Sequence, residues 1–274
     1  LVILAGLTSA GGTVMQTAKD TAGNSYSYIQ NDPFDTRIYK LPNGLTLYLS
    51  RNPMRPRVSV LTIVRAGSSD EPADSTGLAH YFEHMMFKGT PRMGTLDWAK
   101  EKPLLDRISE LFEQRKMEPD PVRKKELYAE IDRVSGEAAK YAAAGEFSKL
   151  ASSFGASGLN AATGVDFTVY MGELPANELG NYLKLDAERF SNPVLRLFHT
   201  ELEAVYEEFN RSQDKDGMVS YQELNRALLP AHPAGRPIIG EPDHLKNPSM
   251  KDIMTFFNRY YVPGNMALAI IGEQ

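Results

Sequence analysis

The 274-residue chain contains no cysteine, which excludes disulfides, thiolate metal sites and cysteine nucleophiles. A metal site must therefore use histidine, aspartate or glutamate, and only five histidines are present. A large excess of one charge is also missing, because 30 lysines and arginines stand against 35 aspartates and glutamates. The formal charge of −5 argues against nucleic acid as the main partner, since phosphate binding needs a cationic excess.

Long apolar runs are absent too, and no transmembrane segment is expected, because a spanning helix needs about 20 apolar residues. Residues 1–7 are apolar and precede small residues, which resembles the end of a signal peptide; a buried strand or a disordered tail is the alternative. Residues 16–35 are polar and turn-rich and predict a linker. We therefore expect an N-terminal tail at 1–35 and one domain at 36–274. The chain stops directly after a strand-like run, which suggests a cut chain or one completed by another polypeptide.

The order of predicted elements favours an α+β fold. Asn43-Gly44 between the alternating runs Thr36–Leu41 and Leu45–Ser50 predicts a β-hairpin, and Val58–Val64 predicts a third strand. The remaining expectations are helices at Leu78–Phe87, Asn177–Phe190, His199–Arg211, Met218–Leu229 and Met250–Tyr261, a β-type stretch at Leu159–Leu174 and a last strand at Met266–Ile271.

Residues 101–150 differ from the rest of the chain in composition. Twenty-one of these 50 residues are charged, or 42% against 24% for the whole chain. Their apolar positions recur every three or four residues on both sides of a break at Pro119–Pro121. This spacing predicts two antiparallel helices with solvated outer faces, inserted as a hairpin into the domain.

The pattern His80-x-x-Glu83-His84 carries the most chemical information. On a helix, His84 lies about 40° from His80, and Glu83 lies about 60° away on the other side. The opposite face is apolar: Leu78, Tyr81, Phe82 and Met85. The helix is thus expected to bury one face and to present two imidazoles and one carboxylate on the other.

Two imidazoles at i and i+4 can bind one Zn²⁺ at about 2.0–2.1 Å, with room for a third ligand and a water. A zinc-bound water has a pKa of about 7, and Glu83 is placed to take its proton and hand it to a leaving amine. The alternative interpretation is a pair of surface histidines on an amphipathic helix. The intact motif on an opposed polar face favours the zinc site.

The order His-x-x-Glu-His is the inverzincin motif. The segment Ser75–Thr90 resembles the pitrilysin, insulin-degrading-enzyme and mitochondrial-processing-peptidase family. The likeness runs from about Thr36 to the C-terminus and includes Gly158–Thr163, Glu201–Glu208 and Tyr261–Met266. It implies the N-terminal catalytic half of a zinc peptidase, with a mainly antiparallel sheet packed against helices. The insert and Glu101–Leu105 look closest to a bacterial, often exported subgroup, which implies the periplasm or cell envelope.

The third zinc ligand is expected on the helix that begins near His199. Periodicity places Glu201 with Glu208 on one flank of the apolar face, and Glu203 with Glu207 on the other, and does not choose between them. The resemblance implies that Glu208 is the ligand and that Glu201 supports the site, as metal ligands need orienting partners. Glu207 is the reserve candidate.

The resemblance also implies how substrate binds. Asn160 and Ala161 match an edge strand that adds an extended substrate to the sheet, so that backbone pairing supplies sequence-tolerant affinity. The expected function is a zinc-dependent metalloendopeptidase domain acting on peptides or unfolded proteins. A second homologous half, as a C-terminal continuation or a separate subunit, is expected to be needed for full activity.

Other functions remain as alternatives. One is a non-catalytic structural or partner subunit, although the usual mark of such relatives is a degraded zinc motif. Another is a binding module in which the insert docks a partner. Residues 212–223 partly match a calcium loop, but Ser212 stands where aspartate is needed, so calcium is not expected. The three remaining histidines are expected to be structural: His199, His232 and His244.

Overall fold

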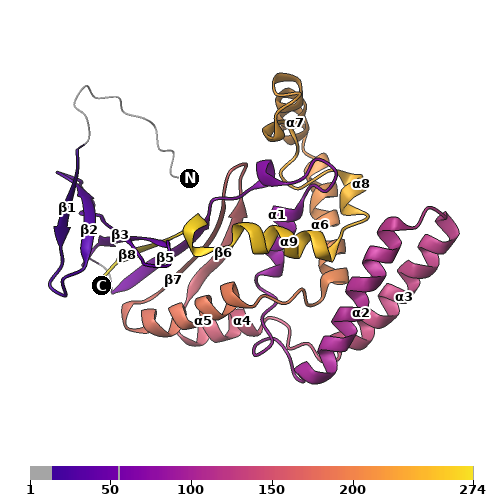
Figure 1. Ribbon diagram of the computed structural model, residues 1–274, viewed down its shortest axis with the longest axis horizontal. Helices are drawn as coiled ribbons and strands as arrows, with labels where there is room; N and C mark the ends of the chain where they lie inside the picture. Colours follow the sequence, from indigo (N-terminus) through magenta and orange to yellow (C-terminus); the bar gives the residue numbers. More distant parts are fainter. Residues whose placement is uncertain (1–13, 55, 274) are drawn as a thin grey trace.

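In the part of the chain that the structure describes, eight strands form a mostly antiparallel sheet in the order β1-β2-β3-β4-β8-β5-β7-β6 (Figure 1). The computed structural model describes residues 14–54 and 56–273. Within them β4 and β8 pair in parallel, and the other neighbouring pairs are antiparallel. The strands are β1 Met15–Lys19, β2 Ser25–Ile29, β3 Arg37–Lys40, β4 Thr46–Arg51, β5 Arg57–Val64, β6 Ser157–Thr163, β7 Thr168–Pro175 and β8 Met266–Gly272.

The helices pack on one face of this sheet. Burial alternates along β5, where Val58, Val60, Thr62 and Val64 are buried and the residues that alternate with them are only partly covered. The expected α+β class is therefore confirmed. The helices are α1 Leu78–Met85, α2 Trp98–Met117, α3 Pro121–Ala139, α4 Glu146–Ser153, α5 Leu179–Ser191, α6 Phe198–Gln213, α7 Asp216–Leu228, α8 Pro242–Leu245 and α9 Met250–Tyr260.

The inserted hairpin is present as α2 and α3, which lie side by side away from the sheet (Figure 1). Asp120 caps α3 by accepting a hydrogen bond from the Val122 amide, and Pro121 occupies its first turn. The hairpin is shorter than the expected 101–150, because a bridge between Thr95 and Ala142 closes its base. The rest of that segment forms α4, which packs against α5.

Residues 16–35 are not a linker, and this prediction was wrong. They form the hairpin β1–β2, which extends the sheet beyond β3. Its turn is closed by Asp20, whose carboxylate accepts the amides of Ala22 and Asn24, with Gly23 at a φ of 86°. Both strands are short, MQTAK and SYSYI, and they lack the aliphatic alternation that marks a buried strand. The signal-like residues 1–7 lie outside the described residues, and no described helix is long and apolar enough to cross a membrane.

Candidate active site

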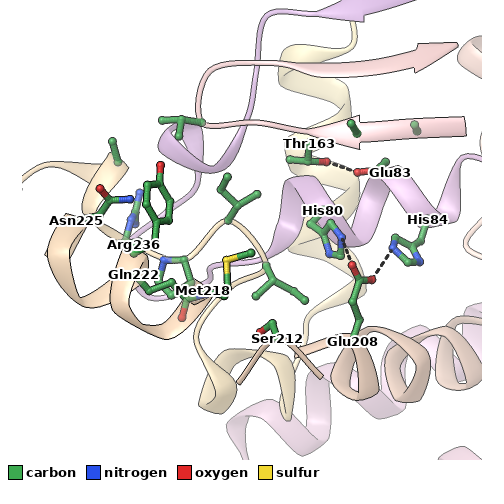
Figure 2. A pocket seen from close by; sticks show the side chains of 18 of the residues that line it. His80, Glu83, His84, Thr163, Glu208, Ser212, Met218, Gln222, Asn225 and Arg236 are labelled. Atoms are coloured by element: carbon green, nitrogen blue, oxygen red, sulfur yellow. Dashed lines mark hydrogen bonds and ion pairs between the residues drawn. The ribbon is translucent and has the colours of Figure 1, made fainter. Parts of the chain in front are cut away.

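Helix α1 has the two opposed faces that its sequence predicts. Leu78, Tyr81, Phe82 and Met85 are buried. Phe82 stacks on Phe257 of α9, with ring centroids 4.9 Å apart. The other face turns His80, Glu83 and His84 toward a cavity of about 640 Å³ (Figure 2). Packing of the apolar face against the core therefore orients His80, Glu83 and His84 toward the cavity.

The start of α1 is fixed by a buried carboxylate. Glu71 accepts hydrogen bonds from the amides of Gly77 and Ala79, both at 2.8 Å, next to His80 in the chain. Gly77 has a φ of 85°, and a Cβ there would lie 2.7 Å from the Ile239 carbonyl oxygen. Burial raises the pKa of Glu71 to about 8. Sequence reasoning did not single out Glu71.

Helix α6 brings Glu208 to the two imidazoles. Glu208 Oε1 lies 3.7 Å from His80 Nε2, and its Oε2 lies 3.5 Å from His84 Nε2 (Figure 2). The three ligand atoms lie within 4.8 Å of one another. Two donors about 2.0–2.1 Å from a tetrahedral zinc are about 3.3 Å apart, so this set of donors fits zinc. Glu207, the reserve candidate, does not join them and lines a different cavity on the other flank of α6.

Glu201 lies behind His84 and accepts a hydrogen bond from His84 Nδ1 at 2.8 Å. It also pairs with Lys88. Burial alone would lower the pKa of His84, but the hydrogen bond and the charges of Glu201, Glu83 and Glu208 raise it above its ordinary value. Glu201 is thus placed to fix the ring so that Nε2 faces Glu208.

Burial favours the neutral imidazole at His80. Burial, and secondarily the neighbouring His84, lowers the pKa of His80 to about 3. Its Nδ1 is buried without a hydrogen-bond partner in the described part of the chain. A neutral ring leaves the lone pair of Nε2 free, as a metal ligand requires.

Glu83 lies between the cluster and the sheet. Burial raises the pKa of Glu83, although the hydroxyl of Thr163, which donates to its carboxylate, opposes this shift. Thr163 ends β6, and Asn160 and Ala161 of the same strand line the cavity. Within the described chain β6 is the last strand of the sheet, so its outer edge is unpaired beside Glu83.

The opposite wall of the cavity is formed by α7 and residues 234–239. Met218 and Tyr221 of α7 are exposed apolar side chains there, and no residue of α7 is buried. Figure 1 shows α7 standing away from the body of the molecule. The segment that partly matches a calcium loop is helical from Asp216 onward.

Sequence reasoning missed Lys88, Thr163, Met218 and Tyr221 at this site. Of these, only Lys88 carried a signal, since it lies four residues after His84. Thr163 reaches the cavity from β6, and Met218 and Tyr221 reach it from α7, and both elements are far from α1 in the chain. Two of the remaining histidines are structural as expected: His232 accepts the Ala234 amide, and His244 accepts the Thr76 amide.

A family model described as "Insulinase (Peptidase family M16)" matches residues 46–101, which include the zinc motif. The match to this insulinase family model is thus local and covers the segment from β4 to the start of α2. A relative named as an uncharacterized zinc protease of Rickettsia felis is 23% identical over 238 residues, covering 86% of this chain and 46% of the relative. The family resemblance expected from the motifs is therefore confirmed.

Solved structures share the fold of this chain. A protease from Helicobacter pylori has a TM-score of 0.64 at 23% identity, covering 87% of this chain and 46% of that one. The crystal structure of pitrilysin has a TM-score of 0.63 at 21% identity, covering 96% of this chain and 23% of that one. The chain thus spans about half the length of the Rickettsia felis relative and of the Helicobacter pylori protease, and 23% of the length of pitrilysin.

Proposed function

We propose that this chain is the catalytic, zinc-binding half of a metalloendopeptidase. His80, His84 and Glu208 would hold the zinc, and the observation that carries the proposal is the convergence of both Nε2 atoms on one carboxylate, with Glu83 beside them. The match of residues 46–101 to the M16 family model and a relative named as a zinc protease support the metal. When bound, zinc acts as a Lewis acid toward water and the scissile carbonyl oxygen.

Glu83 is the proposed general base and acid. Its raised pKa keeps it able both to accept a proton from the attacking water and to release it to the leaving amine. The Thr163 hydroxyl holds one carboxylate oxygen, which leaves the other free for proton transfer. Glu201 acts through its hydrogen bond with His84, and Lys88 acts through its ion pair with Glu201.

The substrate we propose is an extended segment of an unfolded peptide. The unpaired edge of β6 at Asn160 and Ala161 can hydrogen-bond a peptide backbone of any sequence. The facing wall, with Met218 and Tyr221, offers apolar contacts for the side chains. A folded protein cannot present an isolated strand to such an edge.

A second homologous half is part of the proposal, because the chain covers only 46% of the Rickettsia relative. This second half would close the open side of the cavity and raise the affinity for the peptide substrate. We further propose an exported bacterial protein, on the resemblance of the insert and Glu101–Leu105 to an exported subgroup. A non-catalytic subunit is the alternative, and it would not require Glu83.

The test is cleavage of a quenched, unstructured peptide mixture by the zinc-loaded chain, with Glu83→Gln as the matched blank. Cleavage by the native chain alone supports a complete catalytic set in these residues. If the folded, zinc-loaded chain fails to cleave even when supplied with a homologous second half, the non-catalytic alternative holds. Binding of zinc is measured separately, so loss of metal is not mistaken for loss of catalysis.

A further inference from the structure

A second cavity, of about 980 Å³, lies on the flank of α6 that faces away from the metal-ligand cluster. We call it the hairpin cleft, because α2 and α3 of the inserted hairpin form one wall and α6 the other. Lys246, at the end of α8, closes one side. The charged residues that line the hairpin cleft are Arg115, Lys124, Lys125, Asp132, His199, Glu203, Glu207 and Lys246.

The cations of the hairpin wall lack carboxylate partners. Helices α2 and α3 together carry nine lysines and arginines. Six have a carboxylate oxygen within 4.0 Å: Lys100, Lys102, Arg107, Lys116, Arg123 and Arg133. The three without one among the described residues are Arg115, Lys124 and Lys125, the same three that line the cleft. Lys246, the fourth cation of the cleft, is likewise unpaired there and lies 5.6 Å from the ring centroid of Tyr206.

The carboxylates of the facing wall are also unpaired with cations. No lysine or arginine nitrogen of the described chain lies within 4.0 Å of Glu203 or Glu207. Glu203 has only the Tyr128 hydroxyl, at 3.5 Å. Opposite charges therefore face each other across the hairpin cleft without contact, which leaves space for a group that bridges them.

Two buried polar atoms border the cleft without hydrogen-bond partners in the described chain. One is Nε of Arg115, whose pKa is lowered by burial and whose Nη1 donates to the Lys246 carbonyl. The other is Nδ1 of His199, whose side chain is only 8% exposed. Tyr128 lies between them, with its ring centroid 5.1 Å from the Arg115 guanidinium carbon and 5.0 Å from the His199 ring. Buried polar atoms without partners are costly, so a ligand group that hydrogen-bonds to them would stabilise them.

We propose that the hairpin cleft binds a short peptide with free termini. The peptide carboxylate would lie against Arg115, Lys124, Lys125 and Lys246, and its ammonium group would lie against Glu203 and Glu207. A simple anion would meet the repulsion of these glutamates and of Asp132, whereas a zwitterion satisfies both walls. The volume is at the upper end of the range for small-ligand sites, about 300–1,000 Å³.

Ligand binding at the cleft is expected to couple to the metal cluster. Helix α6 carries Glu203 and Glu207 on one flank and Glu208 on the other, and the Glu208 side chain is 49% exposed. A ligand that orders this part of α6 would order Glu208 as well. Coupling between sites is reciprocal, so an occupied cleft should raise zinc affinity by about fivefold or more. An unchanged zinc affinity overturns the coupling.

The test is calorimetric titration of the Glu83→Gln chain with triglycine, so that no hydrolysis takes place. Binding should persist in EDTA, which separates the cleft from the metal cluster. It should weaken tenfold or more in the double variant Lys124→Gln/Lys125→Gln and stay unchanged in Arg123→Gln. Arg123 is the matched control, because it lies in the same turn but pairs with Glu126 outside the cleft.

Each other outcome overturns the proposal. Absence of triglycine binding, or its loss with EDTA, shows that the cleft holds no peptide. Binding of inorganic phosphate in place of triglycine shows a plain anion site. Equal binding of N-acetyl-triglycine amide, which has neither terminal charge, shows that the charged walls are not used. Unfolding temperatures of the variants establish that a lost interaction is not a lost fold.

Discussion

Replacing Glu201 with glutamine isolates the effect of its charge on the metal cluster. Glutamine keeps the size of the side chain and can still accept a hydrogen bond from His84 Nδ1 through its amide oxygen. It removes the negative charge that faces His84 and Lys88. Because the Glu201 side chain is only 13% exposed, water screens this charge weakly.

Removal of a partner that orients a metal ligand typically weakens metal affinity about 10–100-fold. This range corresponds to about 1.4–2.7 kcal/mol of binding free energy. Because the charge of Glu201 is weakly screened, we expect the loss of zinc affinity to lie toward the upper end of this range. For a chain of this size, about 2–4 °C of unfolding temperature corresponds to 1 kcal/mol. Zinc should therefore raise the Tm of Glu201→Gln by about 3–10 °C less than it raises that of the native chain.

The assay is a competitive zinc titration against a chromogenic chelator, with thermal unfolding as the second measurement. The matched control is Glu203→Gln, on the other flank of the same helix, which should change zinc affinity less than twofold. Native affinity in Glu201→Gln would refute the assigned role. An equal loss in both variants would show that α6 responds to any lost charge, and this would refute the reasoning as well.

Three further predictions follow from the same contacts. Glu208→Gln should weaken zinc binding by more than about 100-fold, while Glu207→Gln stays within twofold; the reverse order in the same titration would exchange their roles. Tyr221→Ala should raise KM about three- to tenfold for peptides with bulky apolar side chains and leave kcat nearly unchanged; an equal effect on all-glycine linkers would contradict an apolar contact. Because burial raises the pKa of Glu71 from 4.5 to about 8, the folded state holds its proton more tightly than the unfolded chain. The free energy of unfolding should thus fall as pH rises from about 5 to 8, by up to about 1.4 kcal/mol per unit, and equal slopes in the native chain and Glu71→Gln would refute this.

Much of the fold was predictable because it depends on local patterns. The Asn43-Gly44 turn and the apolar face of α1 are specified by neighbouring residues, and both occur where expected. The hairpin β1–β2 was missed, because its strands are short and carry few aliphatic residues, and the hairpin joins the sheet through the pairing of β2 with β3. Burial there comes from the neighbouring strand and not from the segment's own hydrophobicity.

The candidate site was likewise predictable from local patterns only in part. Periodicity put Glu201 with Glu208 and Glu203 with Glu207, but a helix alone has no preferred neighbour for either flank. The packing of α6 between α1 and the inserted hairpin turns the first pair toward His80 and His84, and the second pair toward the hairpin cleft.

The sequence alone determined the helix with two imidazoles and a carboxylate on one face, because those positions are fixed by 3.6 residues per turn. It also determined that no metal site in this chain has a thiolate donor, since cysteine is absent. Only the tertiary structure decided which glutamate meets the imidazoles, and which strand edge and apolar wall face Glu83. These groups come from elements that are far apart in the chain, and long-range packing, which has no local period, sets their positions.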